Sequence, residues 1–518
     1  MRFLLPFCFS LALSAADSTS DGKQWWQHIL FLADDKLEGR NAGSEGHGQA
    51  VEYVAGQFRA LGLKPVIQTV PFLTKQIDEP NSSLELIRDG KATKLTFGKE
   101  ANIAMRSDPA EFVEAPMVFV GYGMKIPEKG YDDLAGLDLR GKLAVMLSNA
   151  GPAEISGPLR SHMQGAERWK ALRAAGAIGT VTVSNPKHAD IPWERASLAR
   201  FAVAMDIDEE KLRDNAGNKL AVTMNAQYAG LFFEGSGHTI EELFELAEAG
   251  RRLPRFNMSG TLKAHTAVKR GKVTSQNIAA VIEGHDPKLK NEFVVLSAHI
   301  DHIGIGQPIN GDRINNGAMD NASGVAALIE VARALKPLNR SVMLAVVTGE
   351  EKGLLGSRYF AEHPPIGDRK IVADFNLDMF LPLHPLKILS IQGLDESTLG
   401  ADIRAASSEF GVKVMGDMEP QRNLFVRSDQ YSFIKKGIPA LAFKFGYEKG
   451  SPEEQLQKAW LKNRYHAPSD DVNQPVDLEG AAKFLKILTH LASRVADASE
   501  RPHWNDSSFF KRFAEPVH

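Results

Sequence analysis

The pattern of apolar and polar positions changes character twice along this chain. Between Val51 and Leu61, apolar side chains recur at helical spacing, and Gly62 follows where a helix is expected to end. From residue 66 to 260, short β-type runs alternate with glycine turns, whereas from residue 274 onward strands alternate with helices. The pattern therefore predicts a separate small domain placed within a larger α/β domain.

The later part of the chain carries continuous apolar runs, which are typical of strands buried on both faces of a sheet. Residues 293–297 form the clearest of these runs. The other strands expected here are residues 342–347, 371–377 and 438–445. Because helical patterns separate these strands, we expect an α/β sheet with helices on both faces.

The N-terminal residues have the composition of a targeting segment. A positive charge at Arg2 precedes an apolar stretch from Phe3 to Leu13, and small residues then lead into a polar run. This order is typical of a cleavable signal peptide, here residues 1–16, and predicts a secreted or periplasmic protein. The single cysteine, Cys8, falls inside that segment, so the mature chain would have neither a disulfide nor a cysteine ligand.

Composition excludes two classes of protein. The net formal charge is −3, from 61 basic and 64 acidic residues, whereas a nucleic-acid-binding protein normally has a basic face. No internal apolar run approaches the roughly 20 residues that span a bilayer, so no transmembrane segment is expected. With 518 residues the chain is too long for one hydrophobic core, and we expect two or three domains.

Acidic and histidine residues cluster where the predicted strands end. The residues concerned are His299, Asp301, Asp320, Glu350, Glu351, Asp378 and His466. Each of them alone has an ordinary structural explanation: Asp320 precedes a helix and could cap it, and adjacent glutamates usually face solvent. In open α/β sheets, however, binding sites form beyond the carboxyl ends of strands. Their joint placement in one domain therefore predicts a single site.

The residue types suit a pair of metal ions. Imidazole nitrogen and carboxylate oxygen are good ligands for Zn²⁺, with Mn²⁺ or Co²⁺ as alternatives. Two ions roughly 3.5–4 Å apart need a bridging carboxylate between them. One further carboxylate, outside the coordination sphere, can then take a proton from water. We therefore expect two zinc ions at this site.

These motifs resemble those of the M28 family of zinc peptidases over nearly the whole mature chain. The segments that carry the resemblance are Ser297–His302, Asp320–Gly324, Gly349–Gly353, Asn376–Met379, Tyr465-His466 and the N-terminal segment from Leu37 to Leu63. The resemblance implies a mixed central β-sheet flanked by helices. Residues 119–123 together with Gly141-Lys142 are similar to a protease-associated domain, a β-rich domain often inserted at this position.

The resemblance also sets the expected domain boundaries. They are a signal peptide at 1–16, an N-terminal part of the peptidase domain at 17–105, a protease-associated-like insert at 106–260, the main peptidase domain at 261–500 and a tail at 501–518.

The resemblance implies a role for each candidate ligand. Asp320 would bridge both zinc ions. His299 and Asp378 would complete one metal site, and Glu351 and His466 would complete the other. The peptide bond that follows Asp320 is often cis in the family.

The remaining roles concern groups outside the coordination sphere. Glu350 would be the general base, and Asp301 would orient His299, since a ligand histidine usually donates its second N–H to a carboxylate or carbonyl. Gln430 stands where the family often has histidine, which puts substrate contacts near it in question. His302 receives no role and is expected to pack beneath the site.

The function implied is a secreted two-zinc exopeptidase that acts on a peptide or protein substrate, and aminopeptidase is the commonest activity in this family. A carboxypeptidase or a glutaminyl cyclase on the same fold is an alternative, because the sequence does not reveal which end of a substrate is recognised. A non-catalytic receptor-like relative is a third reading, although such relatives usually lose ligands that this chain retains.

Overall fold

The computed structural model describes residues 10–148, 150–188 and 191–514, with no side chains described for residues 10–20. The expected signal peptide therefore lies mostly outside the described residues. The chain forms two compact units. The first comprises Met1–Val70, Thr274–Glu419 and Arg427–His518, and the second comprises Pro71–Val273 and Pro420–Val426.

The first unit is built on a mixed β-sheet. Its strands, in spatial order, are β1 (Val66–Ile77), β13 (Val268–Ile282), β17 (Ser341–Val347), β14 (Glu292–His299), β18 (Lys370–Asn376), β21 (Ala440–Phe445), β19 (Ile388–Gln392) and β20 (Lys413–Met415). The central four, β17, β14, β18 and β21, are parallel, whereas β13 and β19 run antiparallel to their central neighbours. The expected strands form, and the sheet is mixed as the family resemblance implied.

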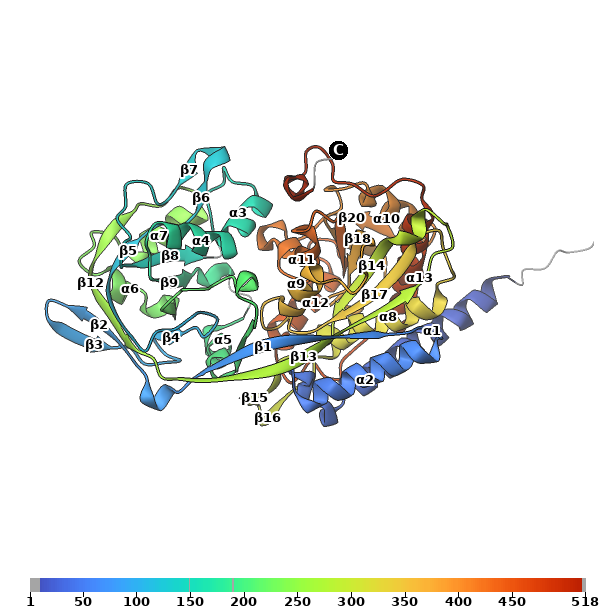
Figure 1. The fold of residues 1–518 in the computed structure, drawn as a ribbon, viewed down its shortest axis with the longest axis horizontal. Coiled ribbons are helices and arrows are strands. Elements are labelled where there is room, and N and C mark those ends of the chain that lie inside the picture. The colour runs from blue at the N-terminus through green and yellow to red at the C-terminus, as the bar shows by residue number, and fades with distance from the viewer. Residues whose placement is uncertain (1–9, 149, 189–190, 515–518) are drawn as a thin grey trace, which may run out of the picture. The chain divides into compact units, whose positions relative to one another are not determined.

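Helices cover both faces of this sheet (Figure 1). One face packs against α1 (Ser10–Leu32), α2 (Glu45–Ala60), α8 (Ser323–Ala334), α10 (Leu399–Ser408) and α13 (Leu478–Asp497), and the other against α9 (Leu355–Glu362) and α11 (Gln430–Ile434). A further helix, α12, spans Pro452–Asn463. The period of two along β14 separates the faces: Val294 and Leu296 join one core, and Phe293 and Val295 join the other.

The second unit has its own sheet of eight strands. In spatial order they are β3 (Lys91–Lys94), β2 (Ser83–Arg88), β12 (Phe256–His265), β5 (Phe112–Phe119), β8 (Leu143–Ser148), β9 (Gly179–Ser184), β11 (Ala221–Met224) and β4 (Ala101–Ile103). Its main helices are α3 (Gly157–Gln164), α4 (Ala166–Ala174) and α7 (Ile240–Glu248). The short β-type runs expected in this part of the chain form the strands of this sheet.

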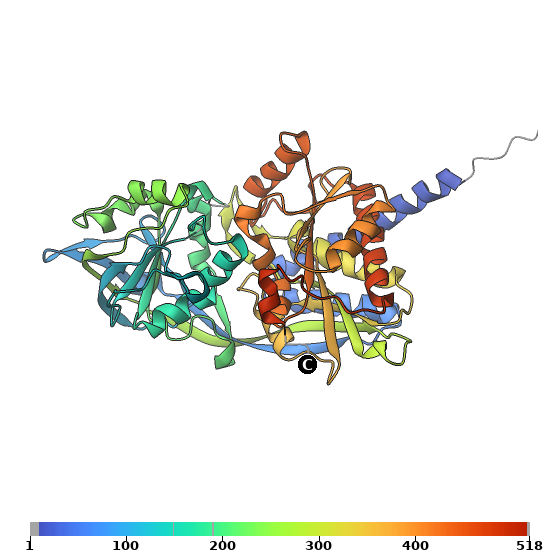
Figure 2. The same cartoon turned by 90° about the horizontal axis from the view of Figure 1, so that it is seen from above.

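The second unit begins at Pro71, whereas the sequence placed the start of the insert at residue 106. The difference arises because β2 pairs with both β3 and β12, so residues 83–94 belong to the sheet of this unit. The chain enters and leaves the unit through β1 and β13, two long strands that run side by side (Figure 1, Figure 2).

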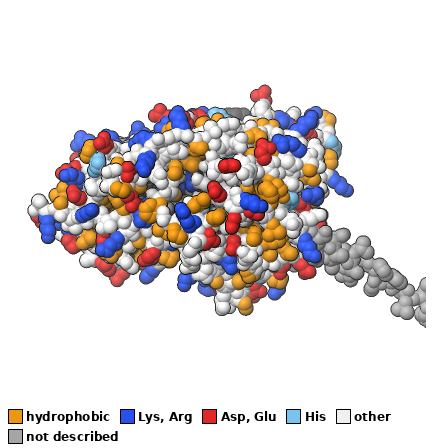
Figure 3. Space-filling view, turned by 90° about the horizontal axis from the view of Figure 1, so that it is seen from below, with side chains coloured by type: hydrophobic (Ala, Val, Ile, Leu, Met, Phe, Trp, Pro, Cys, Tyr) orange, Lys and Arg blue, Asp and Glu red, His pale blue; other side chains and the backbone are white. Residues whose placement is uncertain are grey.

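No helix in the described part of the chain is both long and apolar enough to cross a membrane. On the face shown in Figure 3, acidic and basic side chains are interspersed.

Candidate metal centre

The parallel strands of the first unit bring the candidate residues to one edge of the sheet. β14 pairs in parallel with both β17 and β18, so the carboxyl ends of all three lie together. His299 is the last residue of β14, Glu350 and Glu351 follow β17, and Asp378 follows β18. Asp320 precedes α8 in a short turn of π-helix, Ala318–Ala322.

One group of donors surrounds Oδ1 of Asp320. His299 Nε2 lies 3.3 Å from Asp320 Oδ1 and 3.5 Å from Asp378 Oδ1. His299 and Asp320 are buried, and Asp378 is nearly so. Three ligand atoms of these residues lie close enough to one another to hold one cation.

A second group of donors surrounds Oδ2 of Asp320. His466 Nε2 lies 3.4 Å from Asp320 Oδ2 and 3.2 Å from Glu351 Oε2. His302, which received no role from the sequence, approaches the same carboxylates: its Nδ1 is 2.8 Å from Glu351 Oε1 and 3.9 Å from Asp320 Oδ2. Glu351 thus has a histidine beside each oxygen, and Asp320 has a different donor group at each oxygen.

The backbone around Asp320 is held by groups that the sequence analysis did not single out. The carboxylate of the buried Asp470 accepts hydrogen bonds from the N–H groups of Met319, at 3.0 and 3.2 Å, and Asp320, at 2.9 Å. The Asp320-Asn321 peptide bond is cis. Asn321 Nδ2 donates to the carbonyl of Leu377 at 2.8 Å, which links the turn that carries Asp320 to the segment before Asp378.

Asp301 contacts the centre through both its carbonyl group and its carboxylate. His299 Nδ1 lies 3.1 Å from the carbonyl oxygen of Asp301, whereas the carboxylate Oδ1 is 4.0 Å away. That carboxylate oxygen instead accepts the backbone N–H of Glu350 at 3.2 Å. Residue 301 therefore orients His299 with its carbonyl group and the turn at Glu350 with its side chain.

The donor set passes a direct test of fit to a cation. His299 Nε2, Asp320 Oδ2 and Asp378 Oδ1 are buried atoms without a hydrogen-bond partner. A buried polar atom without a partner is costly, and native proteins rarely leave several of them together. Imidazole nitrogens and carboxylate oxygens are also the ligand types that zinc prefers. These residues therefore fit divalent metal ions.

The charges at the centre are strongly coupled. Burial by itself would lower the pKa of His299, but contacts with Asp320 and Asp378 outweigh burial and raise it well above the ordinary value. His466 behaves in the same way beside Glu351 and Asp320. Burial would raise the pKa of Glu351, yet His466 and His302 hold it well below its usual range. The carboxylate of Glu351 is thus held in the ionised form that metal binding requires, whereas both histidines must release a proton when they bind a cation.

Glu350 differs from its neighbour. Burial raises the pKa of Glu350 well above its usual range, and the charges of Glu351 and Asp378 push it in the same direction, against the opposing effect of His299. A carboxylate with a raised pKa binds a proton more readily, which suits a group that must accept and return one. Glu350 therefore has the electrostatic surroundings of a general base.

Gln430 lies in a buried network beneath the centre. It is 1% exposed, and its Oε1 accepts a hydrogen bond from Asn376 Nδ2 at 2.7 Å. The side chain of the neighbouring Asp429 is fully buried, and burial raises its pKa to about 7. Gln430 is therefore part of the support for the end of β18.

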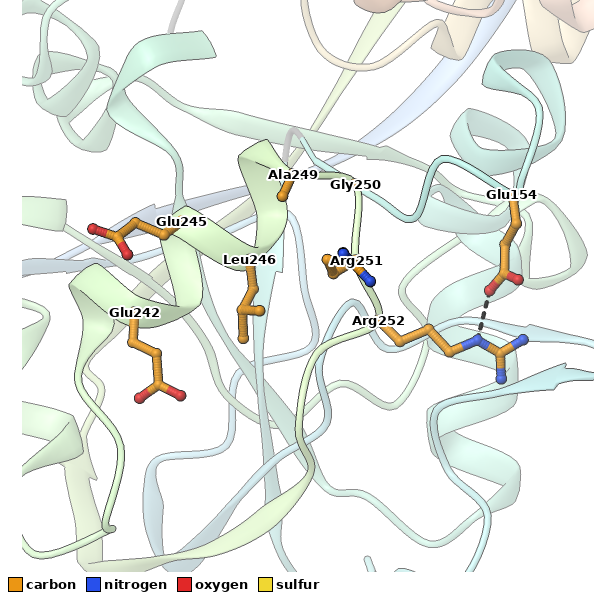
Figure 4. A pocket seen from close by; sticks show the side chains of 8 residues that line it. All are labelled: Glu154, Glu242, Glu245, Leu246, Ala249, Gly250, Arg251 and Arg252. Atoms are coloured by element: carbon orange, nitrogen blue, oxygen red, sulfur yellow. Dashed lines mark hydrogen bonds and ion pairs between the residues drawn. The ribbon is translucent and has the colours of Figure 1, made fainter.

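The second unit carries a separate cavity of about 750 Å³ (Figure 4). Its lining includes Glu154, whose Oε1 accepts a hydrogen bond from Arg252 Nε at 2.6 Å. None of the candidate metal ligands lines it. This cavity does not supply the donor set found at the end of the sheet.

The first unit combines a mixed α/β sheet with histidines and carboxylates that converge at its strand ends. These features are those of a metal-binding α/β domain. Residues 277–492 match the profile of peptidase family M28. The match agrees with the family resemblance that the motifs indicated.

Comparison with known proteins gives the following relatives. A probable leucine aminopeptidase 2 of Aspergillus fumigatus is 30% identical over 213 residues, which cover 38% of this chain and 40% of the relative. A probable leucine aminopeptidase 2 of Aspergillus oryzae is 28% identical over 330 residues, 59% of this chain and 61% of the relative. The chain thus matches less than two thirds of the length of either.

A solved structure shares the fold. The aminopeptidase of Aneurinibacillus sp. strain AM-1 aligns with a TM-score of 0.56 at 22% identity and covers 93% of this chain and 96% of its own. At this level of identity the likeness concerns the fold.

Proposed function

We propose that this protein is a two-zinc aminopeptidase. The observation that carries the proposal is the position of Asp320 between two donor groups. Its Oδ1 faces His299 Nε2 at 3.3 Å, and its Oδ2 faces His466 Nε2 at 3.4 Å. A carboxylate that presents one oxygen to each of two ligand groups is suited to bridge two cations. Both leucine aminopeptidase relatives support the choice of activity.

The proposed ligands follow from these contacts. Asp320 would bridge the ions, His299 and Asp378 would hold one, and Glu351 and His466 would hold the other. His302 lies beside the Glu351 oxygen that does not face His466, and it would orient that carboxylate. Because its ring also lies within reach of Asp320, His302 is the alternative ligand at the second position.

The chain's own groups account for the proton transfers. When bound, zinc polarises the scissile carbonyl and lowers the pKa of water. Glu350 takes the proton from the attacking water and returns it to the leaving amine. The turn that carries Glu350 is fixed by the hydrogen bond from its N–H to Asp301, and the same residue fixes His299 through its carbonyl. Base and ligand are thus aligned by one residue.

A substrate panel tests the activity against its nearest rivals. An aminopeptidase must recognise a free ammonium group, whereas a carboxypeptidase must recognise a carboxylate. We expect the purified protein to hydrolyse aminoacyl chromogenic substrates and to leave N-blocked peptides with free C-termini intact. Cleavage of the blocked peptides alone, or cyclisation of N-terminal glutamine, would replace the aminopeptidase proposal by the corresponding rival.

Zinc removal should abolish activity and lower stability together. A ligand that binds only the folded state stabilises it by about 2.7 kcal/mol at a concentration 100 times its Kd. We therefore expect the chelated protein to hydrolyse no aminoacyl substrate, and added zinc to restore turnover and raise the thermal midpoint by several degrees. Full activity in protein shown by elemental analysis to lack metal would overturn the proposal. A chain that neither binds metal nor turns over would instead support the receptor-like reading.

The cellular setting and the second unit complete the proposal. The segment at residues 1–16 is proposed to be a signal peptide that exports the protein, and the sheet-containing second unit is proposed to be a protease-associated domain. N-terminal sequencing of the exported protein tests the first, since the mature chain should begin near Asp17.

A further inference from the structure

Arg40 has surroundings unusual for an arginine. Its side chain is 1% exposed, yet no carboxylate lies in contact with it among the described residues. Burial lowers the pKa of Arg40 to about 10, even though Asp470, Asp301 and the ligand carboxylates act in the opposite direction. The guanidinium is therefore charged and desolvated at neutral pH, which is costly unless its N–H groups are satisfied.

Four backbone carbonyls satisfy the guanidinium. Nε donates to Ile300 at 2.9 Å, Nη1 donates to Asn316 at 2.6 Å and also to Leu32, and Nη2 donates to Gly317 at 3.0 Å. The accepting carbonyls come from three segments that are far apart in the sequence. A planar fork with five donors spreads its hydrogen bonds over four carbonyls, whereas the three donors of lysine radiate from a single atom.

Two of these segments carry the proposed zinc ligands. Ile300 directly follows His299, and Gly317 lies three residues before Asp320. The carbonyl of Arg40 in turn accepts the N–H of His302 at 3.3 Å. Arg40 therefore joins the end of β14 to the turn that presents the bridging carboxylate.

The backbone is shaped to bring Arg40 into this position. Arg40 has a φ of 50°, and the preceding Gly39 has a φ of 69°. A Cβ at Gly39 would lie 2.3 Å from the carbonyl oxygen of Asn315, so no other residue fits there without movement. Asn316 adds a further link, since its side chain donates to Asp35 at 2.8 Å and to the carbonyl of Ala33 at 3.0 Å.

We propose that Arg40 is a positioning residue of the metal centre, which sets the distance between His299 and the bridging Asp320. The inference rests on the proposed two-zinc function. Arg40 lies outside residues 277–492, in the N-terminal segment from Leu37 to Leu63 that shares in the resemblance.

Two substitutions separate geometry from charge. Arg40→Lys keeps the positive charge and loses the fork, whereas Arg40→Met loses both. Removing a buried positive charge favours cation binding by electrostatics alone, so a charge effect would make Arg40→Met bind zinc more tightly than the wild type. Loss of positioning predicts instead that Arg40→Met binds zinc more weakly than the wild type. We expect both variants to bind zinc at least about tenfold more weakly, the lower end of the effect of groups that orient ligands.

Arg340 provides the matched control. It is also fully buried and donates to a carboxylate and to carbonyls, namely Glu292 Oε2 at 2.7 Å and the carbonyl of Val495 at 3.2 Å. It precedes β17 at the amino end of the parallel strands, whereas the ligands lie at the carboxyl ends. Arg340→Lys should lower stability while leaving zinc affinity within about twofold of the wild type.

Zinc affinity is measured on metal-free protein by competition with a chromogenic chelator at 25 °C, after circular dichroism has shown each variant to be folded. Weaker binding by Arg40→Lys and Arg40→Met, with unchanged binding by Arg340→Lys, supports the inference. Unchanged affinity in Arg40→Lys, tighter binding by Arg40→Met, or an equal loss in the control overturns it. Failure of both Arg40 variants to fold while the control folds also overturns it, because Arg40 then serves folding. If the wild-type protein itself binds no zinc, the proposed two-zinc function is wrong, whatever the role of Arg40.

Discussion

Replacing Glu350 by glutamine should leave the protein with its full zinc content and almost no turnover. Glutamine has the shape of glutamate but cannot accept the proton of the attacking water, and general base catalysis contributes about 10²–10⁴-fold to rate. Glu350 is also not among the residues whose atoms surround Asp320 at ligand distance. We therefore expect kcat to fall by about 10³-fold, with KM changed little. Steady-state kinetics on an aminoacyl substrate, with elemental analysis of the same sample, measure both quantities.

The control for this variant is Glu479→Gln, on the exposed first turn of α13. It removes the same charge far from the strand ends and should keep both zinc and turnover. A Glu350→Gln protein with normal kcat refutes the assignment of the base. A variant that loses zinc as well as activity makes Glu350 a ligand, and the two glutamates would then exchange roles.

The central strands were predictable because they are buried on both faces. The run at 293–297 lies within β14, every residue of which is buried. A short, continuous apolar run of this kind is typical of a strand buried on both faces. β13 was missed for the opposite reason. Its first third, from Val268 to Lys272, is mostly polar and largely exposed. Such a segment becomes a strand because a long partner, β1, lies beside it.

The ligands were predictable from their residue types and their places after strands, but the groups that hold them were not. Asp470 and Arg40 contact the backbone of the centre through turns whose dihedral angles no spacing rule predicts. Whether the carboxylate or the carbonyl of Asp301 contacts His299 could not be predicted for the same reason. The sequence placed a carboxylate two residues after His299, yet the local turn brings the carbonyl to Nδ1 instead. Side-chain chemistry can be read from residue types, whereas the orientation of main-chain groups requires coordinates.

Replacing Asp320 by asparagine should empty both metal positions at once. Asparagine keeps the size of the side chain, but it removes the negative charge that offsets the repulsion of two cations, and its amide nitrogen cannot coordinate a metal ion. Because the two oxygens of Asp320 face different histidines, at 3.3 and 3.4 Å, one substitution affects both donor groups. We expect zinc affinity to fall by more than about 100-fold, beyond the effect of groups that only orient ligands, and zinc content to fall well below one equivalent.

His466→Ala separates bridging from ordinary ligation, since His466 belongs to only one donor group. It should lose one equivalent of zinc and retain the other, which His299 and Asp378 continue to hold. Asp402→Asn serves as the matched control and should retain both ions. Asp402 lies on α10, and the substitution breaks its ion pair with Arg494, whose Nε is 3.0 Å from Asp402 Oδ1. If Asp320→Asn lost only a single ion, as His466→Ala is expected to, the carboxylate would belong to one metal alone. The water between two ions, and with it the role proposed for Glu350, would then need a different arrangement.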